Sequence, residues 1–293
     1  MNVRNLSIKS SLKRGNNLLL PSNVRGLIVG RSNCGKTVLL LNLLLNDDWL
    51  DYNNLLVFGN SLHQKEYKVV KQGFEMKLSK NQISNLFENQ ELIDPMVALC
   101  NYKGKALGNI SAEFYENCDE IPDPKSLDST KKNLLILDDC FLGKQSKAAA
   151  YYTRGRHSSC DTWFISQNYF ALPRKSVREN SNIICLYPQN SKSVLHIYQD
   201  HCTDLPFQEF KDLCKYIWRD EFNFLTIDLT SSLMNGKYRE NLERFYIPKS
   251  CFTESVDDGV PDHRGSFEEK GTCSGIYRYE KGDSCKKRKY KGK

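Results

Sequence analysis

One eight-residue segment constrains this 293-residue chain more than any other, and it reads Gly30-Arg31-Ser32-Asn33-Cys34-Gly35-Lys36-Thr37. A glycine, four variable positions and Gly-Lys-Thr together form the P-loop pattern, which binds phosphate. The short apolar run at 26–29 predicts a buried strand before the loop, and the apolar run at 38–45 predicts a helix after it. The order strand, glycine-rich loop, helix is the order that a triphosphate site requires.

Each residue type in this segment has a defined part in holding phosphate. Gly30 and Gly35 let the backbone approach an anion without an intervening Cβ atom. Successive backbone N–H groups then point inward at the positive end of the following helix. Lys36 is expected to reach the β- and γ-phosphates, and the Thr37 hydroxyl is expected to bind Mg²⁺. We therefore predict that residues 30–37 bind a nucleoside triphosphate.

A second apolar run, residues 134–137, ends in two carboxylates, Asp138 and Asp139. Four consecutive aliphatic residues are typical of a central parallel strand that is buried on both faces. Carboxylates at the C-terminal end of such a strand lie where open α/β sheets bind their ligands. Asp138 is suited to hold Mg²⁺, usually through water. Asp139 is placed to orient or deprotonate the attacking water.

A third apolar run, residues 162–166, predicts another strand and is followed by Gln167. An amide at this position can sense the γ-phosphate or position water, and the alternative is a solvent-facing loop amide. Arg154 and Arg156 precede the strand. One of them could reach the γ-phosphate of a neighbouring subunit as an arginine finger, and the alternative is a surface or DNA-phosphate arginine.

The remaining pattern predicts one P-loop domain over residues 21–249, preceded by an arm at 1–20. Residues 55–59 predict a second parallel strand, which makes a crossover unit with the P-loop segment. Residues 60–132 are interpreted in part as a surface insertion, with a loop over 113–128. Further helices are expected near 144–152, 192–201 and 207–218, and further strands at 183–187, 222–229 and 244–247. We expect residues 250–293 to be a disordered basic tail.

Charge is concentrated at the C-terminus. The formal net charge is +7, and the last ten residues supply +6, so the rest of the chain is close to neutral. Such a tail suits a nuclear-import signal or a nucleic-acid tether, or it is a solvated end.

Cysteine usage and hydropathy indicate an intracellular protein. The eleven cysteines form no Cys-x-x-Cys pair, so we expect reduced thiols rather than a zinc site or a disulfide framework. No apolar run of about 18 residues predicts a membrane span. The N-terminal residues lack the apolar core of a secretory signal.

The segment from 134 to 187 indicates which class of P-loop proteins this chain resembles. It contains LLILDD, then RGRHSSCDTWFISQNYFALP, then VREN before a predicted strand. This segment resembles the FtsK/HerA superfamily. Within that superfamily it is most similar to the poxvirus-type genome-packaging ATPases of large DNA viruses and of virus-like elements such as polintons and virophages. The resemblance spans roughly residues 25–247 and does not cover the tail.

The resemblance implies the α/β fold of RecA/ASCE-like P-loop NTPases, with a mostly parallel central sheet flanked by helices. It also implies a homo-oligomeric ring, a hexamer or a pentamer, that hydrolyses ATP with Mg²⁺. Such a ring drives double-stranded DNA into a preformed capsid, so DNA and capsid proteins are the implied partners. The implied location is the virion assembly site in the nucleus or cytoplasm of a host cell.

The resemblance implies that Lys36 and Thr37 are the phosphate-binding and Mg²⁺-binding residues of the P-loop. It implies that Asp138 binds Mg²⁺ and that Gln167 senses the γ-phosphate. It makes Arg156 the arginine that acts on a neighbouring subunit. Asp139 departs from the pattern, because the superfamily usually has a glutamate there. The side chain is one methylene shorter, so its role as general base is left open, and it could act through a water.

Two other functions remain open on the residues alone. The first is a P-loop phosphotransferase for a small molecule, with residues 154–157 as the candidate lid. The second is a non-enzymatic nucleotide switch or scaffold that binds DNA through its tail.

Overall fold

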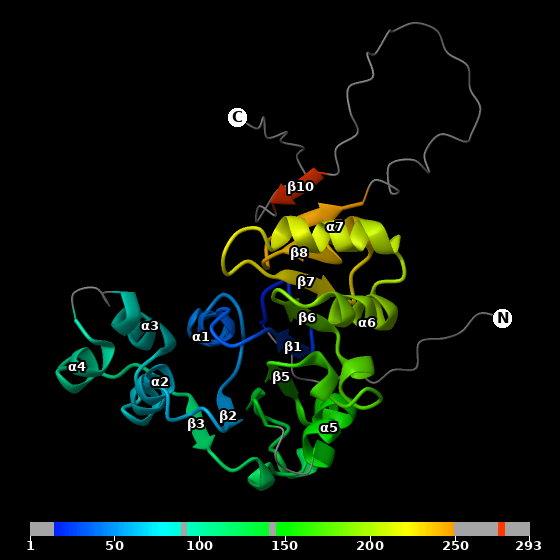
Figure 1. Cartoon of the computed structure of the whole chain (residues 1–293). Coiled ribbons are helices and arrows are strands. Elements are labelled where there is room, and N and C mark those ends of the chain that lie inside the picture. The colour runs from blue at the N-terminus through cyan, green and yellow to red at the C-terminus, as the bar shows by residue number, and fades with distance from the viewer. Residues whose placement is uncertain (1–14, 89–92, 141–144, 249–274, 279–293) are drawn as a thin grey trace, which may run out of the picture. The chain divides into compact units, whose positions relative to one another are not determined.

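The computed structural model describes residues 15–88, 93–140, 145–248 and 275–278 (Figure 1). The chain divides into two compact units. Unit 1 contains Met1–Arg25, Thr37–Ile165 and Pro173–Asn180. Unit 2 contains Gly26–Lys36, Ser166–Leu172 and Ser181–Lys293.

The strands of unit 1 are all parallel and follow the order β5-β4-β2-β3. Every residue of β4 is buried, as expected for an aliphatic strand with a neighbour on each side. Their bounds are Asn54–Gly59 for β2, Ser111–Tyr115 for β3, Asn133–Asp138 for β4 and Cys160–Ser166 for β5, whose last residue belongs to unit 2.

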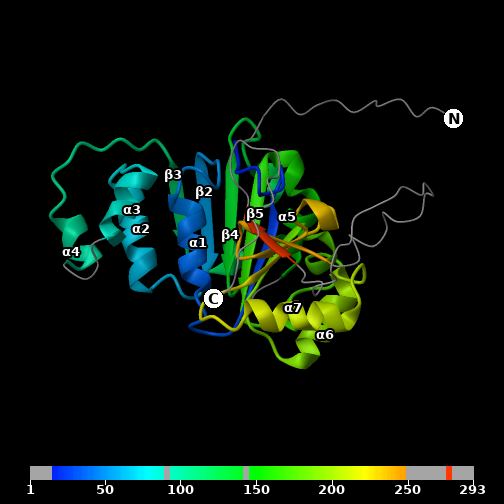
Figure 2. The same ribbon diagram turned by 90° about the horizontal axis from the view of Figure 1, so that it is seen from above.

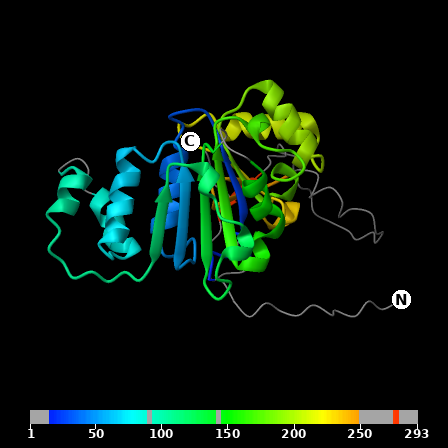
Figure 3. The same ribbon diagram turned by 90° about the horizontal axis from the view of Figure 1, so that it is seen from below.

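Three helices of unit 1 lie within residues 60–132, which were interpreted from the sequence in part as a surface insertion. Figures 2 and 3 show α2, α3 and α4 gathered beside β3, and α2 contacts β3 directly. The loop predicted over 113–128 begins inside β3, whose residues are only partly buried and carry no strong apolar signal. The helices of this unit are α1 (Lys36–Leu45, with its first residue in unit 2), α2 (Lys65–Glu75), α3 (Lys80–Glu88), α4 (Pro95–Cys100) and α5 (Gln145–Arg154).

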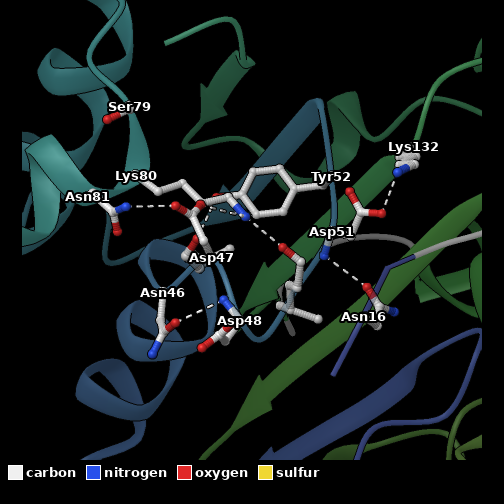
Figure 4. Close-up of polar contacts among 12 residues, drawn as sticks. Asn16, Asn46, Asp47, Asp48, Asp51, Tyr52, Ser79, Lys80, Asn81 and Lys132 are labelled. Atoms are coloured by element: carbon white, nitrogen blue, oxygen red, sulfur yellow. Dashed lines mark hydrogen bonds and ion pairs between the residues drawn. The ribbon is translucent and has the colours of Figure 1, made fainter. Parts of the chain in front are cut away.

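A buried lysine fixes α3 to the segment between α1 and β2 (Figure 4). Lys80 donates from Nζ to the Leu50 carbonyl at 2.6 Å, and this Nζ lies 4.3 Å from the centroid of the Tyr52 ring. The Asp47 carboxylate lies 3.9 Å from the same Nζ. Burial lowers the pKa of Lys80, and the neighbouring carboxylates oppose this effect. Cation–π and hydrogen-bond contacts therefore offset part of the cost of burying this ammonium.

The strands of unit 2 follow the order β10-β9-β8-β7-β6-β1. β1 and β6 are parallel, whereas the other neighbours are antiparallel. Helix α7 lies across β8 (Figure 1), where Phe210 meets Tyr238 at 6.3 Å between ring centroids. The elements are β1 (Arg25–Val29, with its first residue in unit 1), β6 (Ile183–Leu186), α6 (Ser191–His201), α7 (Phe207–Ile217), β7 (Leu225–Asp228), β8 (Tyr238–Glu240), β9 (Arg244–Ile247) and β10 (Gly275–Arg278).

The predicted α/β class, with a mostly parallel sheet flanked by helices, is confirmed. Strands β8 and β10 were not predicted, and β10 falls in the stretch expected to be a disordered tail. The rest of the predicted tail, 250–274 and 279–293, lies outside the described residues. Residues 15–20 of the predicted arm are described, and Leu19 and Leu20 are buried.

Across the part of the chain that the structure describes, no helix has both the length and the apolar character to cross a membrane.

A buried ion pair closes the β7–β8 hairpin of unit 2. Arg239 and Asp228 are both almost fully buried, and Nη2 lies 2.5 Å from Oδ2. Arg239 also donates from Nε to the Gly236 carbonyl at 2.7 Å.

We expect Arg239→Met to destabilise the chain by about 3–5 kcal/mol, because it leaves the Asp228 carboxylate buried without its counter-ion. Urea unfolding measures the loss. Arg219→Met is the matched control, since that arginine pairs with Asp220 at 3.4 Å and both side chains are more than half exposed, so its loss should cost less than about 1 kcal/mol. Equal losses in the two variants would contradict the prediction.

Candidate nucleotide-binding site

The loop between β1 and α1 adopts a tight turn that depends on its glycines. Asn33 and Gly35 have positive φ values of 60° and 99°. A Cβ atom on Gly30 would lie 2.5 Å from Cys34 Sγ and 2.6 Å from Tyr187 Cβ, so this position has no room for a side chain. Burial raises the pKa of the Cys34 thiol against the opposing charge of Lys36, so this thiol packs as a neutral group.

Two side chains hold the loop in place. Lys36 donates from Nζ to the carbonyls of Gly30 at 2.8 Å and Arg31 at 2.7 Å, so its ammonium lies over the loop. Tyr187, which directly follows β6, donates from its hydroxyl to the Gly35 carbonyl at 3.1 Å. Burial raises the pKa of Tyr187, so the phenol remains a donor. No local sequence signal assigned Tyr187 to this loop.

The predicted sensor amide lies against the loop within unit 2. The Gly30 N–H donates to the Ser166 carbonyl at 3.0 Å, which places Ser166, a residue of unit 2, beside the start of the loop. Ser32 then donates from Oγ to Gln167 Oε1 at 3.0 Å. The structure thus brings together the phosphate loop and the amide that the sequence analysis assigned to sensing the γ-phosphate.

An open cleft of about 350 Å³ adjoins this contact. Arg31 and Gln167 line one part of it, and Gln189, Asn190 and Lys192 around the start of α6 line another. Two of these side chains are cationic, and none of the residues lining the cleft is acidic. The cleft therefore offers space and positive charge for an anion next to the loop.

Asp138 ends β4 in unit 1 and is held by a residue that the sequence analysis missed. The carboxylate is buried and accepts a hydrogen bond from the Tyr67 hydroxyl at 2.7 Å. Burial and, after it, the negative charge of Asp138 raise the pKa of Tyr67, so the phenol stays protonated and donates. Tyr67 lies on α2, within the region that the sequence analysis gave no chemical role.

Asp139 has a left-handed backbone, with φ at 55°. Its N–H donates to the Ile165 carbonyl at 3.0 Å, and its own carbonyl accepts from Asn60 Nδ2 at 3.1 Å. A non-glycine residue in this conformation is strained, and such strain occurs often at functional sites. These bonds fix the turn that follows β4.

The other predicted site residues of unit 1 are Thr37 and Arg156. Thr37 is the second residue of α1 and is half-buried. Arg156 lies in a 3₁₀ turn, Gly155–Ser158, where its side chain is exposed and its Nε lies 3.5 Å from His157 Nε2. Residues 30–36 and Gln167 belong to unit 2. The catalytic and metal-binding roles that the sequence suggests for residues of the two units stay predictions.

The expectation of reduced thiols is wrong for two cysteines of unit 1. Cys118 and Cys140 form a disulfide, and Cys140 directly follows Asp139. The sequence gave no pairing signal, because 22 positions separate the two residues and their Cα atoms meet at 5.8 Å only in the fold. The free cysteines in the described part of the chain are Cys34, Cys100, Cys160, Cys185, Cys202 and Cys214.

Comparison with known proteins finds similarity only among solved structures. No protein-family model and no curated protein matches the sequence. The genome packaging NTPase B204 of Sulfolobus turreted icosahedral virus 2, in complex with ATP-gammaS, is 10% identical and has a TM-score of 0.44. This match covers 75% of this chain and 96% of that one.

Two further structures are comparably similar. The DNA-packaging ATPase B204 of Sulfolobus Turreted Icosahedral Virus is 14% identical with a TM-score of 0.45, over 74% of this chain and 95% of that one. VirB4 of Thermoanaerobacter pseudethanolicus is 12% identical with a TM-score of 0.44, over 78% of this chain and 96% of that one. All three TM-scores lie below 0.5 and all three identities lie below 15%, so these matches assign no activity, substrate or partner to this chain.

Proposed function

We propose that this chain is an ATP-hydrolysing motor that moves double-stranded DNA and packages a viral or virus-like genome. The observation that carries the proposal is the contact between Ser32 and Gln167 beside a glycine loop that Lys36 covers. A loop that presents N–H groups and an ammonium, with an amide at its edge, supplies the groups that a triphosphate and an attacking water need.

In the proposed hydrolysis, the loop N–H groups and Lys36 stabilise the charge that develops on the β- and γ-phosphates. Gln167 orients the water that attacks the γ-phosphate, and Asp139 accepts its proton, directly or through a second water. Mg²⁺, when bound, neutralises phosphate charge. Thr37 and Asp138 suit it, because this ion takes oxygen ligands and needs only one or two from the protein beside those of the substrate.

The proposed motor is a homo-oligomeric ring in which Arg156 acts on the nucleotide of a neighbouring subunit. Its exposure supports this role, since an arginine finger must reach beyond its own chain. Capsid proteins are the further partners proposed, at a virion assembly site inside a host cell.

The proposed DNA contacts are made to phosphates and do not depend on base sequence. Movement along a genome requires such contacts, because a motor held by base-specific bonds would stop at its preferred site. A nearly neutral body limits non-specific retention, and the basic C-terminal residues are the proposed tether.

The test is the rate of ATP hydrolysis with and without linear double-stranded DNA. We expect stimulation on the order of tenfold, the size typical of coupling between two ligand sites. Tight ATP binding without DNA-stimulated hydrolysis would favour the nucleotide switch instead. Transfer of phosphate to a nucleoside or its monophosphate would favour the phosphotransferase.

A further inference from the structure

Phe222 has a conformation that packing does not explain. It lies in the connection between α7 and β7, its side chain is 58% exposed, and its φ is 63°. A left-handed backbone is a genuine outlier for a bulky residue. Because the ring is exposed, burial of apolar surface does not offset the backbone strain. Strain of this kind is typical of sites where a side chain must be presented to a ligand.

The exposed ring stands next to the phosphate loop, within unit 2. A Cβ atom built on Gly35 would lie 3.5 Å from Phe222 Cδ1 and 3.5 Å from the Tyr187 hydroxyl oxygen. Tyr187 bonds to the Gly35 carbonyl and packs its ring on Phe224, with the two centroids 5.1 Å apart. Phe222 and Tyr187 therefore both lie beside Gly35, one with an exposed ring and the other with a buried one.

The position along the loop indicates which part of a nucleotide would meet this ring. Ser32 and Gln167 mark the end of the loop proposed to face the γ-phosphate. Phe222 lies instead beside Gly35, at the other end of the loop, where α1 begins. A nucleotide whose γ-phosphate faced Gln167 would have its base directed away from Gln167, and Phe222 presents an exposed ring on the side of the loop away from that contact.

We propose that the Phe222 ring stacks on the base of the bound nucleotide. This inference rests on the proposed function, because it requires a nucleotide in the loop. An aromatic ring beside a flat, weakly hydrated base supplies dispersion and apolar burial without hydrogen bonds. Stacking of this kind accepts every base, since each has a π-face. Phe222 therefore strengthens binding and does not select adenine over guanine.

The first arm of the test compares ATP with inorganic tripolyphosphate by calorimetry. Phe222→Ala should weaken ATP binding roughly 5- to 150-fold, the range for loss of one stacked base, and should leave tripolyphosphate binding unchanged. Phe222→Trp should retain most of the ATP affinity, and its indole fluorescence should change on addition of ATP but not of tripolyphosphate. Tyr216→Ala is the matched control, because that ring is also exposed, on α7, and is covered by Arg219.

The second arm separates a ligand role from a structural one. Phe222→Gly relieves the positive-φ strain, so its free energy of unfolding in urea should equal or exceed that of the wild type. Its affinity for ATP should fall as much as in Phe222→Ala. Unchanged ATP affinity in both variants would overturn the stacking proposal and leave the proposed function standing. Equal losses for ATP and tripolyphosphate would also overturn it. A wild-type chain that binds neither would overturn both.

Discussion

A Lys36→Ala variant is expected to lose roughly 10²- to 10³-fold in the rate of ATP hydrolysis, the range for removal of one preorganised charge-stabilising donor. The Lys36 ammonium already lies over the loop, bonded to the Gly30 and Arg31 carbonyls, so little reorganisation separates it from a bound phosphate. Steady-state phosphate release measures the loss. ATP affinity, measured by calorimetry, should also fall.

The control for Lys36→Ala is Lys215→Ala, which removes an exposed lysine of α7 that pairs with Asp212. It should hydrolyse ATP at the wild-type rate. Thermal unfolding should show that both variants fold, with Lys215→Ala at the wild-type midpoint and Lys36→Ala somewhat lower, because it loses two bonds to its own loop. If Lys36→Ala hydrolysed ATP normally, the nucleotide would not be held by residues 30–37.

An Arg156→Ala variant is expected to bind ATP within about twofold of wild type and to lose about 10³-fold or more in turnover, as arginine fingers do. The reason is that Arg156 is exposed on its own chain and is proposed to act on another. Arg154→Ala is the matched control, since Arg154 lies two residues earlier and pairs with Asp123 at 3.8 Å.

Mixed oligomers test whether this arginine acts between subunits. In a mixture of Arg156→Ala and Lys36→Ala chains, an intact finger can meet an intact P-loop only at some interfaces. Such a mixture should regain part of the activity that each variant lacks alone. A mixture as inactive as its two components, or normal turnover in Arg156→Ala, would remove the finger assignment.

Features encoded by adjacent residues could be predicted from the sequence. The turn at Gly30 and Gly35, the helix that follows the loop and the placement of Asp138 at the end of β4 all follow from short patterns of glycine, aliphatic and acidic residues. The contact of Gln167 with Ser32 agrees with the sequence-based expectation that an amide directly after an apolar strand lies near the phosphate-binding loop.

Features that depend on distant segments could not be predicted. Tyr67 bonds to Asp138 across 71 positions, and Tyr187 bonds to Gly35 across 152. The residues next to Tyr67 in α2 and next to Tyr187 after β6 form no motif that would set either tyrosine apart from others in the sequence. The disulfide between Cys118 and Cys140 was missed for a related reason, since cysteine spacing in a long chain does not specify pairing. β3 was missed because an exposed edge strand has little apolar alternation.

Residues 30–37 are proposed to hold a triphosphate with Gln167 at one end. Amide hydrogen exchange of the full chain, with and without Mg²⁺ and ATP, tests this proposal most directly. We predict slower exchange in peptides that cover residues 30–37 and 166–168, and unchanged exchange in a peptide from α7. ATP binding without protection of residues 30–37, or no binding at all, would show that these residues do not hold the nucleotide.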